Sequence, residues 1–295
     1  MSDNRKRQIL RGPAVPGGKL FWALMGGAAL YTTCVLYIDA HGFPTRKLVE
    51  ADAVMVTGAI MGLLLVFRTN SAYDRWWEAR KLWGQLVNDI RNICIKAKSQ
   101  SDLTTAEHDE LAPLLTAFPY ALKDHLRGLP RDSRHVSALN LNRLEAKHTP
   151  LNISKRISEI IFAWKNSGKI DGSDLVRFDP HMRSLMDTCG ACERIQQSPI
   201  AGAFKALIWF GLIAYMLVLP WLLVPVVDKW ALVLALVAAL FVLGIELLAE
   251  EIEQPFGTGS NDLPLDTICA TIAESVRIVL ESPAVTDHAQ TIETG

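Results

Sequence analysis

The cysteine pair Cys189 and Cys192 has the C-x-x-C spacing that is found in thiol redox sites and in zinc sites. A zinc site of this kind needs further ligands, normally a second cysteine pair or histidines at short spacing. Neither lies nearby in the sequence, and the pair sits in a stretch with helical periodicity. The pattern therefore favours two structural positions on a helix. Cys34, Cys94 and Cys269 make the total odd, which favours reduced thiols over a disulfide framework.

Histidines, phosphate loops and hydrolase triads give no further candidate site. The seven histidines are scattered, and none is four residues from another, so the sequence predicts no metal ligands. The segment 166–169, Asn-Ser-Gly-Lys, lacks the leading glycine and the following Ser or Thr of a phosphate-binding loop. No Ser/His/Asp arrangement stands out. We therefore expect no catalytic residue and no cofactor, and we expect that the protein is not an enzyme.

Carboxylates cluster at the end of the last long apolar stretch. They are Glu246, Glu250, Glu251 and Glu253. A carboxylate inside a bilayer is costly and is therefore a functional candidate, and Glu246 is the only one expected at membrane depth. One interpretation places all four at the cytosolic interface of the membrane, paired with Arg or Lys. Contacts between subunits and a divalent-ion site are the alternatives.

Asp52 precedes another apolar stretch and is the second acidic candidate. Repeated around a symmetric pore, it would form an acidic ring that concentrates cations at the outer mouth. As a single residue at the membrane surface it would have no special role. The sequence leaves both interpretations open.

The composition indicates where these residues are placed. Half of the 295 residues are hydrophobic, and mean hydropathy is positive, which is typical of a membrane protein. The formal net charge of −1 argues against a nucleic-acid partner. Four stretches approach the roughly 20 apolar residues that a spanning helix needs. They are 20–37, 53–67, 206–227 and 230–245.

Basic residues near the ends of these stretches predict the orientation, because they are retained on the cytosolic side. Both termini and the polar middle of the chain should therefore be cytosolic. The basic residues on that side are Arg5, Lys6, Arg7, Arg11 and Lys19 in the leader and Arg68, Arg75, Arg80 and Lys81 after the second stretch, against Arg46, Lys47 and Lys229 in the opposite loops. The predicted organisation is a cytosolic leader at 1–19, membrane helices one and two at 20–67, a cytosolic helical domain at 68–204, membrane helices three and four at 205–249, and a cytosolic C-terminal segment at 250–295.

The sequence pattern predicts helices in the polar part of the chain. Apolar residues between 72 and 98 recur at helical spacing, and no Gly or Pro lies between Phe67 and Gly84. The second span should therefore continue into the cytosol as one long helix. Further helices are expected at 104–126, 151–164 and 179–197. No strand pattern is found, so the predicted fold class is an all-α membrane protein.

Two sequence blocks resemble the signatures of the bestrophin family, in the form that bacterial members carry. The first follows the second span and contains Arg68, Asn70, Arg75, Trp76, Trp77 and Glu78. The second follows the fourth span and contains Pro255, Phe256, Gly257, Asn261 and Asp262. A weaker block at 192–200 leads into the third span. The resemblance covers about residues 15–280.

This resemblance implies a homopentamer in the bacterial inner membrane, with one central pore and a cytosolic helical vestibule. Membrane lipid and small monovalent ions would be the other partners. By distance from the first signature, the family's hydrophobic pore neck falls on Ala59, Leu63 and Phe67. These positions are four apart and so form one stripe on a helix. Apolar rings at a constriction can gate by dewetting, although such a stripe alone more often serves helix packing.

The sequence departs from the family in two places. Ala59 stands where relatives carry a bulkier apolar residue. Thr258, Gly259 and Ser260 stand where animal members have an acidic run that binds calcium. Because calcium needs several carboxylates among roughly six to eight oxygens, we expect no metal there.

The ion that passes is not determined by the sequence. The resemblance implies an anion channel, chiefly for chloride, with a monovalent-cation channel for sodium as the alternative. The predicted vestibule 68–204 carries 20 basic and 16 acidic residues, too even a balance to decide. A membrane-anchored helical scaffold that binds a partner is the alternative from another functional class.

Overall fold

The computed structural model describes residues 18–42, 51–100, 103–129, 134–137, 139 and 148–281, with the side chains of 51–55, 134–135 and 281 left out. Most of the predicted leader and the end of the predicted C-terminal segment lie outside these residues. So does the side chain of Asp52, although its backbone belongs to the first turn of a helix.

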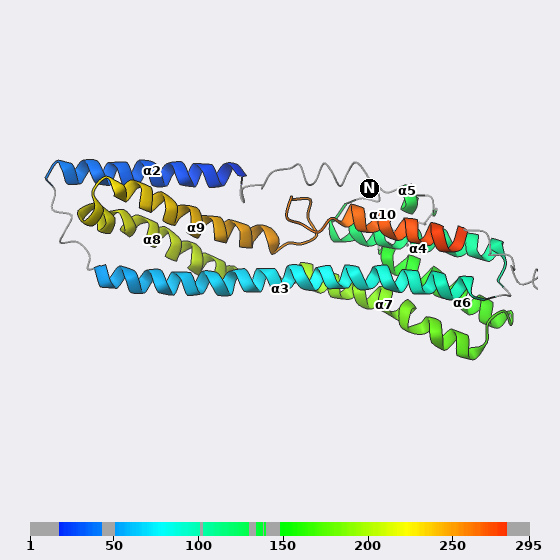
Figure 1. Cartoon of the computed structure of the whole chain (residues 1–295). Coiled ribbons are helices and arrows are strands. Elements are labelled where there is room, and N and C mark those ends of the chain that lie inside the picture. Colours follow the sequence, from blue (N-terminus) through cyan, green and yellow to red (C-terminus); the bar gives the residue numbers. More distant parts are fainter. Residues whose placement is uncertain are drawn as a thin grey trace, which may run out of the picture. The chain divides into compact units, whose positions relative to one another are not determined.

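The described chain forms two units, each with its own core. Unit 1 comprises residues 1–78 and 198–263, and unit 2 comprises 79–197 and 264–295. Every regular element in the described residues is a helix, as predicted (Figure 1). The helix α3 belongs to both units. It runs without interruption from Ala51 to Lys98, which confirms the prediction of one long helix.

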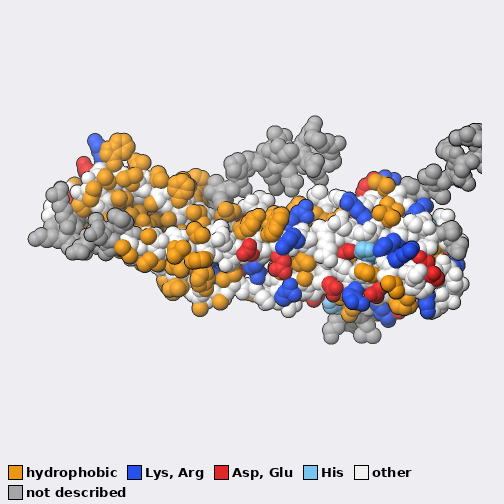
Figure 2. All heavy atoms as spheres, turned by 60° about the horizontal axis from the view of Figure 1, so that its bottom comes forward, with side chains coloured by type: hydrophobic (Ala, Val, Ile, Leu, Met, Phe, Trp, Pro, Cys, Tyr) orange, Lys and Arg blue, Asp and Glu red, His pale blue; other side chains and the backbone are white. Residues whose placement is uncertain are grey.

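Unit 1 consists of α2 (Gly18–Ala40), the first part of α3, α8 (Gly202–Val227) and α9 (Trp230–Ile252), which lie side by side in Figure 1. Of the described helices, α2, α8 and α9 are long and apolar enough to cross a membrane. The predicted second span at the start of α3 is not among them, so the count of four spans stays a prediction. In the view of Figure 2, hydrophobic side chains dominate the surface at the end of the molecule that unit 1 forms.

Apolar contacts and a small residue allow α3 and α8 to pack closely in unit 1. Met61 and Leu65 of α3 form a buried cluster with Ile208 and Leu212 of α8. Gly211 lies beside this cluster, and a methyl group added there would approach the Met61 sulfur to 2.6 Å. The α8–α9 turn is tight, and its Asp228 has a positive φ of 50°.

Polar side chains between the apolar helices find partners inside the unit. The Trp221 indole donates to the Tyr31 hydroxyl at 2.7 Å, and that hydroxyl donates to the Leu217 carbonyl at 2.9 Å. These bonds matter because burying an unpaired polar group in hydrocarbon costs about 4 kcal/mol of free energy.

Unit 2 is a polar helical unit around an apolar core. It contains the rest of α3, α4 (Thr105–Leu126), α5 (Arg134–Ser137), α6 (Thr149–Asn166), α7 (Gly172–Gln197), α10 (Leu265–Val276) and the short π-helix η2 (Arg277–Glu281). The α3 residues with predicted helical spacing, Ala79, Trp83, Leu86, Ile90 and Ile93, are all completely buried. The predicted helices 104–126 and 151–164 match α4 and α6 closely.

Two details differ from the sequence-based expectation. The helix α7 begins at Gly172 rather than near Asp179, because Pro180 is accommodated inside the helix instead of marking its start. The helix α10 was not predicted. It begins directly after Pro264, within the second signature block, where the run of turn-forming residues conceals its start.

Candidate functional site: an exposed stripe and a buried ion-pair network on α3

The predicted neck residues lie on the uncovered side of α3 within unit 1. The side chains of Leu63 and Phe67 are each 56% exposed, and Ala59 is also exposed. The opposite side of the same helix carries Met61 and Leu65, which are buried against α8. With about 100° of turn per residue, Leu63 lies near the centre of the exposed arc. The stripe is therefore not used to pack the helices of unit 1.

The polar residues that follow Phe67 extend the same arc. Asn70 and Asp74 are exposed, and both fall within the angular range of the apolar stripe. Ser71 donates to the carbonyl oxygen of Phe67 at 2.9 Å, a common arrangement on a helix. The exposed side of α3 thus changes from apolar to polar directly after Phe67.

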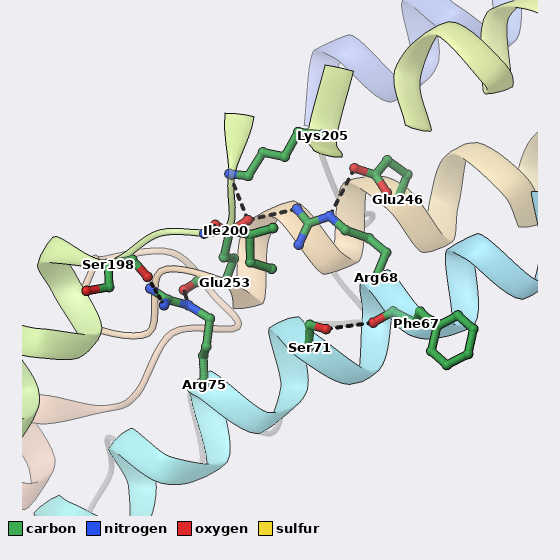
Figure 3. A network of polar contacts seen from close by, with 9 residues as sticks. All are labelled: Phe67, Arg68, Ser71, Arg75, Ser198, Ile200, Lys205, Glu246 and Glu253. Atoms are coloured by element: carbon green, nitrogen blue, oxygen red, sulfur yellow. Dashed lines mark hydrogen bonds and ion pairs between the residues drawn. The ribbon is translucent and has the colours of Figure 1, made fainter. Parts of the chain in front are cut away.

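Arg68 points away from this arc into a buried network (Figure 3). Its guanidinium contacts Glu253 Oε2 at 2.8 Å and Glu246 Oε1 at 3.4 Å, and all three side chains are essentially inaccessible. Lys205 of α8 approaches the same Glu253 oxygen at 2.8 Å. The amide of Ile200 donates to Glu253 Oε1 at 3.1 Å. Two cations therefore face two carboxylates, and the charges balance.

The environment of Glu253 favours its ionised form. Burial opposes ionisation, but the hydrogen bonds from Lys205 and Ile200 and the charge of Arg68 outweigh it. The pKa of Glu253 is consequently held below its ordinary value. The network thus keeps a buried charge on the segment that follows α9.

The carboxylate cluster predicted from the sequence divides into different roles. Glu246 and Glu253 pair with Arg68, which agrees with the interpretation that these residues find basic partners. Glu251 accepts from the Asn261 side chain at 3.0 Å, and Glu250 is exposed. The first two carboxylates therefore hold helices together.

The two signature blocks, far apart in sequence, meet in unit 1. Arg75 donates to the carbonyl of Glu253 at 3.2 Å and also to the carbonyl of Ser198, at the end of the third, weaker block. The Trp76 indole donates to the Asn261 carbonyl at 3.0 Å. The sequence did not predict this meeting, since nothing in either block indicates its partner.

The second block itself forms a compact loop. Pro255 and Phe256 are buried, and the Leu263 amide returns to the Pro255 carbonyl at 2.9 Å. Asp262 accepts from the Gly259 amide at 2.5 Å. A Cβ atom at Gly257 would clash with the Asp262 carboxylate, so any larger residue there would force the Asp262 side chain to shift. Of the remaining signature residues, Trp77 is exposed and Glu78 is half-buried.

None of the described cysteines and histidines belongs to the Arg68 network. Cys189 and Cys192 are buried residues of α7 that carry thiols rather than a disulfide, as the structural interpretation of their spacing predicted. The histidines are less scattered than the sequence indicates, because His125 and His148 both contact Glu193. No spacing rule could have found this group, since its members come from three separate elements.

Comparison with known proteins identifies the family. A family profile described as "Bacterial/Fungal Bestrophin protein" matches residues 19–278. A protein of Ralstonia nicotianae named voltage-dependent anion channel-forming protein is 32% identical over 258 residues, covering 85% of this chain and 84% of the relative. A protein of the same name from Synechocystis is 34% identical over 258 residues, covering 84% of this chain and 83% of the relative.

A solved structure shows the same fold. The crystal structure of a bacterial bestrophin homologue from Klebsiella pneumoniae superimposes with a TM-score of 0.80 at 22% identity, covering 88% of this chain and 98% of that one. The apolar helices α2, α8 and α9 and these matches make the chain a membrane protein. The profile match includes both sequence blocks, which Arg75 and Trp76 join in space. The chain belongs to the bacterial/fungal bestrophin family.

Proposed function

We propose that this chain forms a homopentameric membrane channel that passes small monovalent ions, with no covalent chemistry. The first part of α3 lines the central pore, and rings of Ala59, Leu63 and Phe67 form its hydrophobic neck. Anions, chloride first, are the proposed ions, because the relatives from Ralstonia and Synechocystis are both named as anion channel-forming proteins.

One observation carries this proposal. The apolar stripe on α3 is exposed in unit 1, while Met61, Leu65 and Arg68 on the other side of the helix are buried. A large exposed apolar surface calls for a covering partner or lipid. The change to Asn70 and Asp74 on the same arc is unsuited to lipid and suited to a water-filled vestibule. A stripe that begins apolar and continues polar fits a pore.

The neck would act by excluding water rather than by binding ions. A narrow apolar ring loses its water unless it widens, and ions cannot pass a dry constriction. Ala59 is the smallest of the three side chains, so Leu63 and Phe67 would form the narrowest rings. This neck needs no charged residue and leaves the sign of the ion to other parts of the pore.

The membrane arrangement follows the predicted organisation. The helices α2, α8 and α9 and the start of α3 would cross the inner membrane, with both termini, the domain 68–204 and the segment 250–295 in the cytosol. The basic residues after the second span support this orientation.

Recordings from purified protein in planar bilayers test the proposal. Unitary currents are expected, and the double variant Leu63→Ala/Phe67→Ala should increase conductance or open probability several-fold. Leu207→Ala/Phe210→Ala is the matched control, since these residues are also exposed and apolar but lie on α8. Complete absence of currents would support the scaffold alternative. If the neck variant and the control variant both conduct like the wild type, the proposed neck is excluded.

Asp74 favours the cation channel as a second candidate. It is exposed on the arc of the neck, and a ring of carboxylates next to a constriction attracts cations. Asp52, the predicted outer ring, would act in the same direction. Reversal potentials under a salt gradient distinguish the two ions directly.

A further inference from the structure

Three side chains with metal-binding chemistry converge in unit 2, whereas the proposed pore residues belong to unit 1. His125 lies near the end of α4, His148 immediately precedes α6, and Glu193 lies in α7. The Nε2 atoms of His125 and His148 lie 2.7 Å and 3.1 Å from the same oxygen, Glu193 Oε1. The two imidazole rings stack with their centroids 4.6 Å apart. Three elements thus direct their ligand atoms at one point.

The group is open to ions from solution. The side chains of His125, His148 and Glu193 are 30%, 31% and 25% exposed, so each is held in place while remaining accessible. One potential ligand atom from each residue lies within 4.8 Å of the others, a separation that a single ion can bridge. By contrast, His181 has a carboxylate partner, Asp89 at 2.7 Å, but no second imidazole beside it in the described residues.

We propose that His125, His148 and Glu193 bind a divalent transition-metal ion of the Zn²⁺ type. Two imidazoles and a carboxylate are the ligands of zinc sites that keep a further position for water. Imidazole ligands favour Zn²⁺ and its neighbours, whereas Ca²⁺ and Mg²⁺ prefer sites built from oxygen. The bound ion would tie α4, α6 and α7 together.

Metal binding replaces the hydrogen bonds that the Nε2 atoms of His125 and His148 make to Glu193, and it requires a further rearrangement at His148. His148 Nδ1 accepts from the Leu151 amide at 3.2 Å, which places the proton of the neutral ring on Nε2. When Nε2 binds the metal, the proton moves to Nδ1, and the Leu151 amide turns to water. This bond is exposed, so its loss costs little of the gain from coordination.

Cys189 lies close but is not part of the proposed ligand set. Its Sγ is 3.7 Å from Glu193 Oε1. Cys189 is buried, whereas the side chains of His125, His148 and Glu193 are partly exposed. An ion that arrives from solution therefore meets the two imidazoles and the carboxylate, and Cys189 is left out of the proposed ligand set.

Calorimetric titration of the full chain with Zn²⁺ tests the site, after treatment with chelator and removal of any affinity tag. One ion per chain is expected at pH 7.5. Glu193→Gln and His125→Ala should each weaken binding at least tenfold. His181→Ala and Cys189→Ser should leave it unchanged. Wild-type affinity should fall at least about tenfold at pH 5.5, because protonated imidazole is not a ligand.

Other outcomes overturn the proposal. Absence of Zn²⁺ binding would show that the site does not exist. Binding that persists in both Glu193→Gln and His125→Ala would mean that only adventitious surface binding occurs. Loss of binding in Cys189→Ser would show a different ligand set. Thermal unfolding in chelator checks that the variants are folded. The Co²⁺ absorption spectrum of the unaltered chain is independent of the variants: bands of nitrogen and oxygen coordination are expected, and a thiolate charge-transfer band, or no Co²⁺ bands at all, would contradict the site.

Discussion

At the scale of single residues, Arg68 has the largest expected effect on stability. It is fully buried, and its guanidinium is shared by Glu246 and Glu253. A buried ion pair is not strongly stabilising in itself, because desolvation offsets the attraction. Removing one partner is costly, since it leaves the others buried with their charge. Arg68 therefore matters for the packing of α3 against α9 mainly because its removal would leave buried carboxylates without a partner. The net attraction of the ion pairs is the smaller effect.

Replacement of Arg68 by methionine should consequently destabilise the protein by about 3–5 kcal/mol. The double variant Arg68→Met/Glu246→Gln should recover part of this loss, because one unpaired carboxylate has been neutralised. Unfolding in detergent, followed by circular dichroism, measures both changes. Arg183→Met is the control, since its exposed pair with Asp179 is worth at most about 0.5 kcal/mol. Equal stability of the Arg68 and Arg183 variants would refute the role assigned to the network.

The lowered pKa of Glu253 predicts how stability depends on pH. A carboxyl group with a lower pKa in the folded than in the unfolded state stabilises the fold fully above its ordinary value of 4.5. This stabilisation is lost as the pH falls through the lower, folded-state pKa. Glu253→Gln should therefore show a smaller loss of thermal stability between pH 7 and pH 3 than the wild type. Parallel curves for the two proteins would show that Glu253 does not contribute.

At the scale of elements, α3 combines two tasks on its two sides. Its buried side holds the unit 1 core through Met61 and Leu65, and its other side presents the stripe that we assign to the neck. Because the helix is uninterrupted, the azimuth of each residue follows from its position alone. The exposed arc is apolar at Leu63 and Phe67 and polar at Asp74. This order follows directly from the sequence of the helix.

Asp74 should influence ion preference if this arc faces the pore. Asp74→Asn removes a negative charge from every subunit, so the reversal potential under a salt gradient should shift toward that of the anion. Asp228→Asn is the matched control. It makes the same change in the α8–α9 turn, where Asn also tolerates the positive φ. Identical reversal potentials for wild type and Asp74→Asn would place the carboxylate outside the conduction path.

At the scale of the whole molecule, the proposed function requires assembly. One chain exposes the stripe but cannot enclose a pore, so Leu63 and Phe67 form rings only when several copies surround an axis. The two sequence blocks contact each other within one chain, through Arg75 and Trp76. These contacts hold the fold of the single chain, whereas the exposed side of α3 remains available for the proposed contacts between copies.

The protein mass in solution tests this assembly. Light scattering of the purified channel, corrected for detergent, should give about five times the chain mass of 32.6 kDa. Arg68→Met should reduce the assembled fraction if α3 must be fixed before copies associate. A monodisperse monomer or dimer that still conducts ions would exclude the pentameric pore.

The sequence by itself determined the helical class, the long α3 and the placement of three apolar helices. These features depend on hydrophobic periodicity and on the length of apolar runs, which are local properties of the chain. The signature blocks also indicated the family. The start of α7 was misplaced, because Pro180 is a local breaker signal that packing overrides. The helix α10 as a whole was not predicted, because the turn-forming residues before it conceal its start.

Only the tertiary structure decided which distant residues meet. Arg68 could be seen as a charge after an apolar stretch, and Glu246 as a carboxylate within one, but not as partners. His125, His148 and Glu193 likewise converge only because α4, α6 and α7 pack around one core. Local periodicity fixes the direction of a side chain on its own helix. The partner of that side chain depends on how the helices pack, which no single segment encodes.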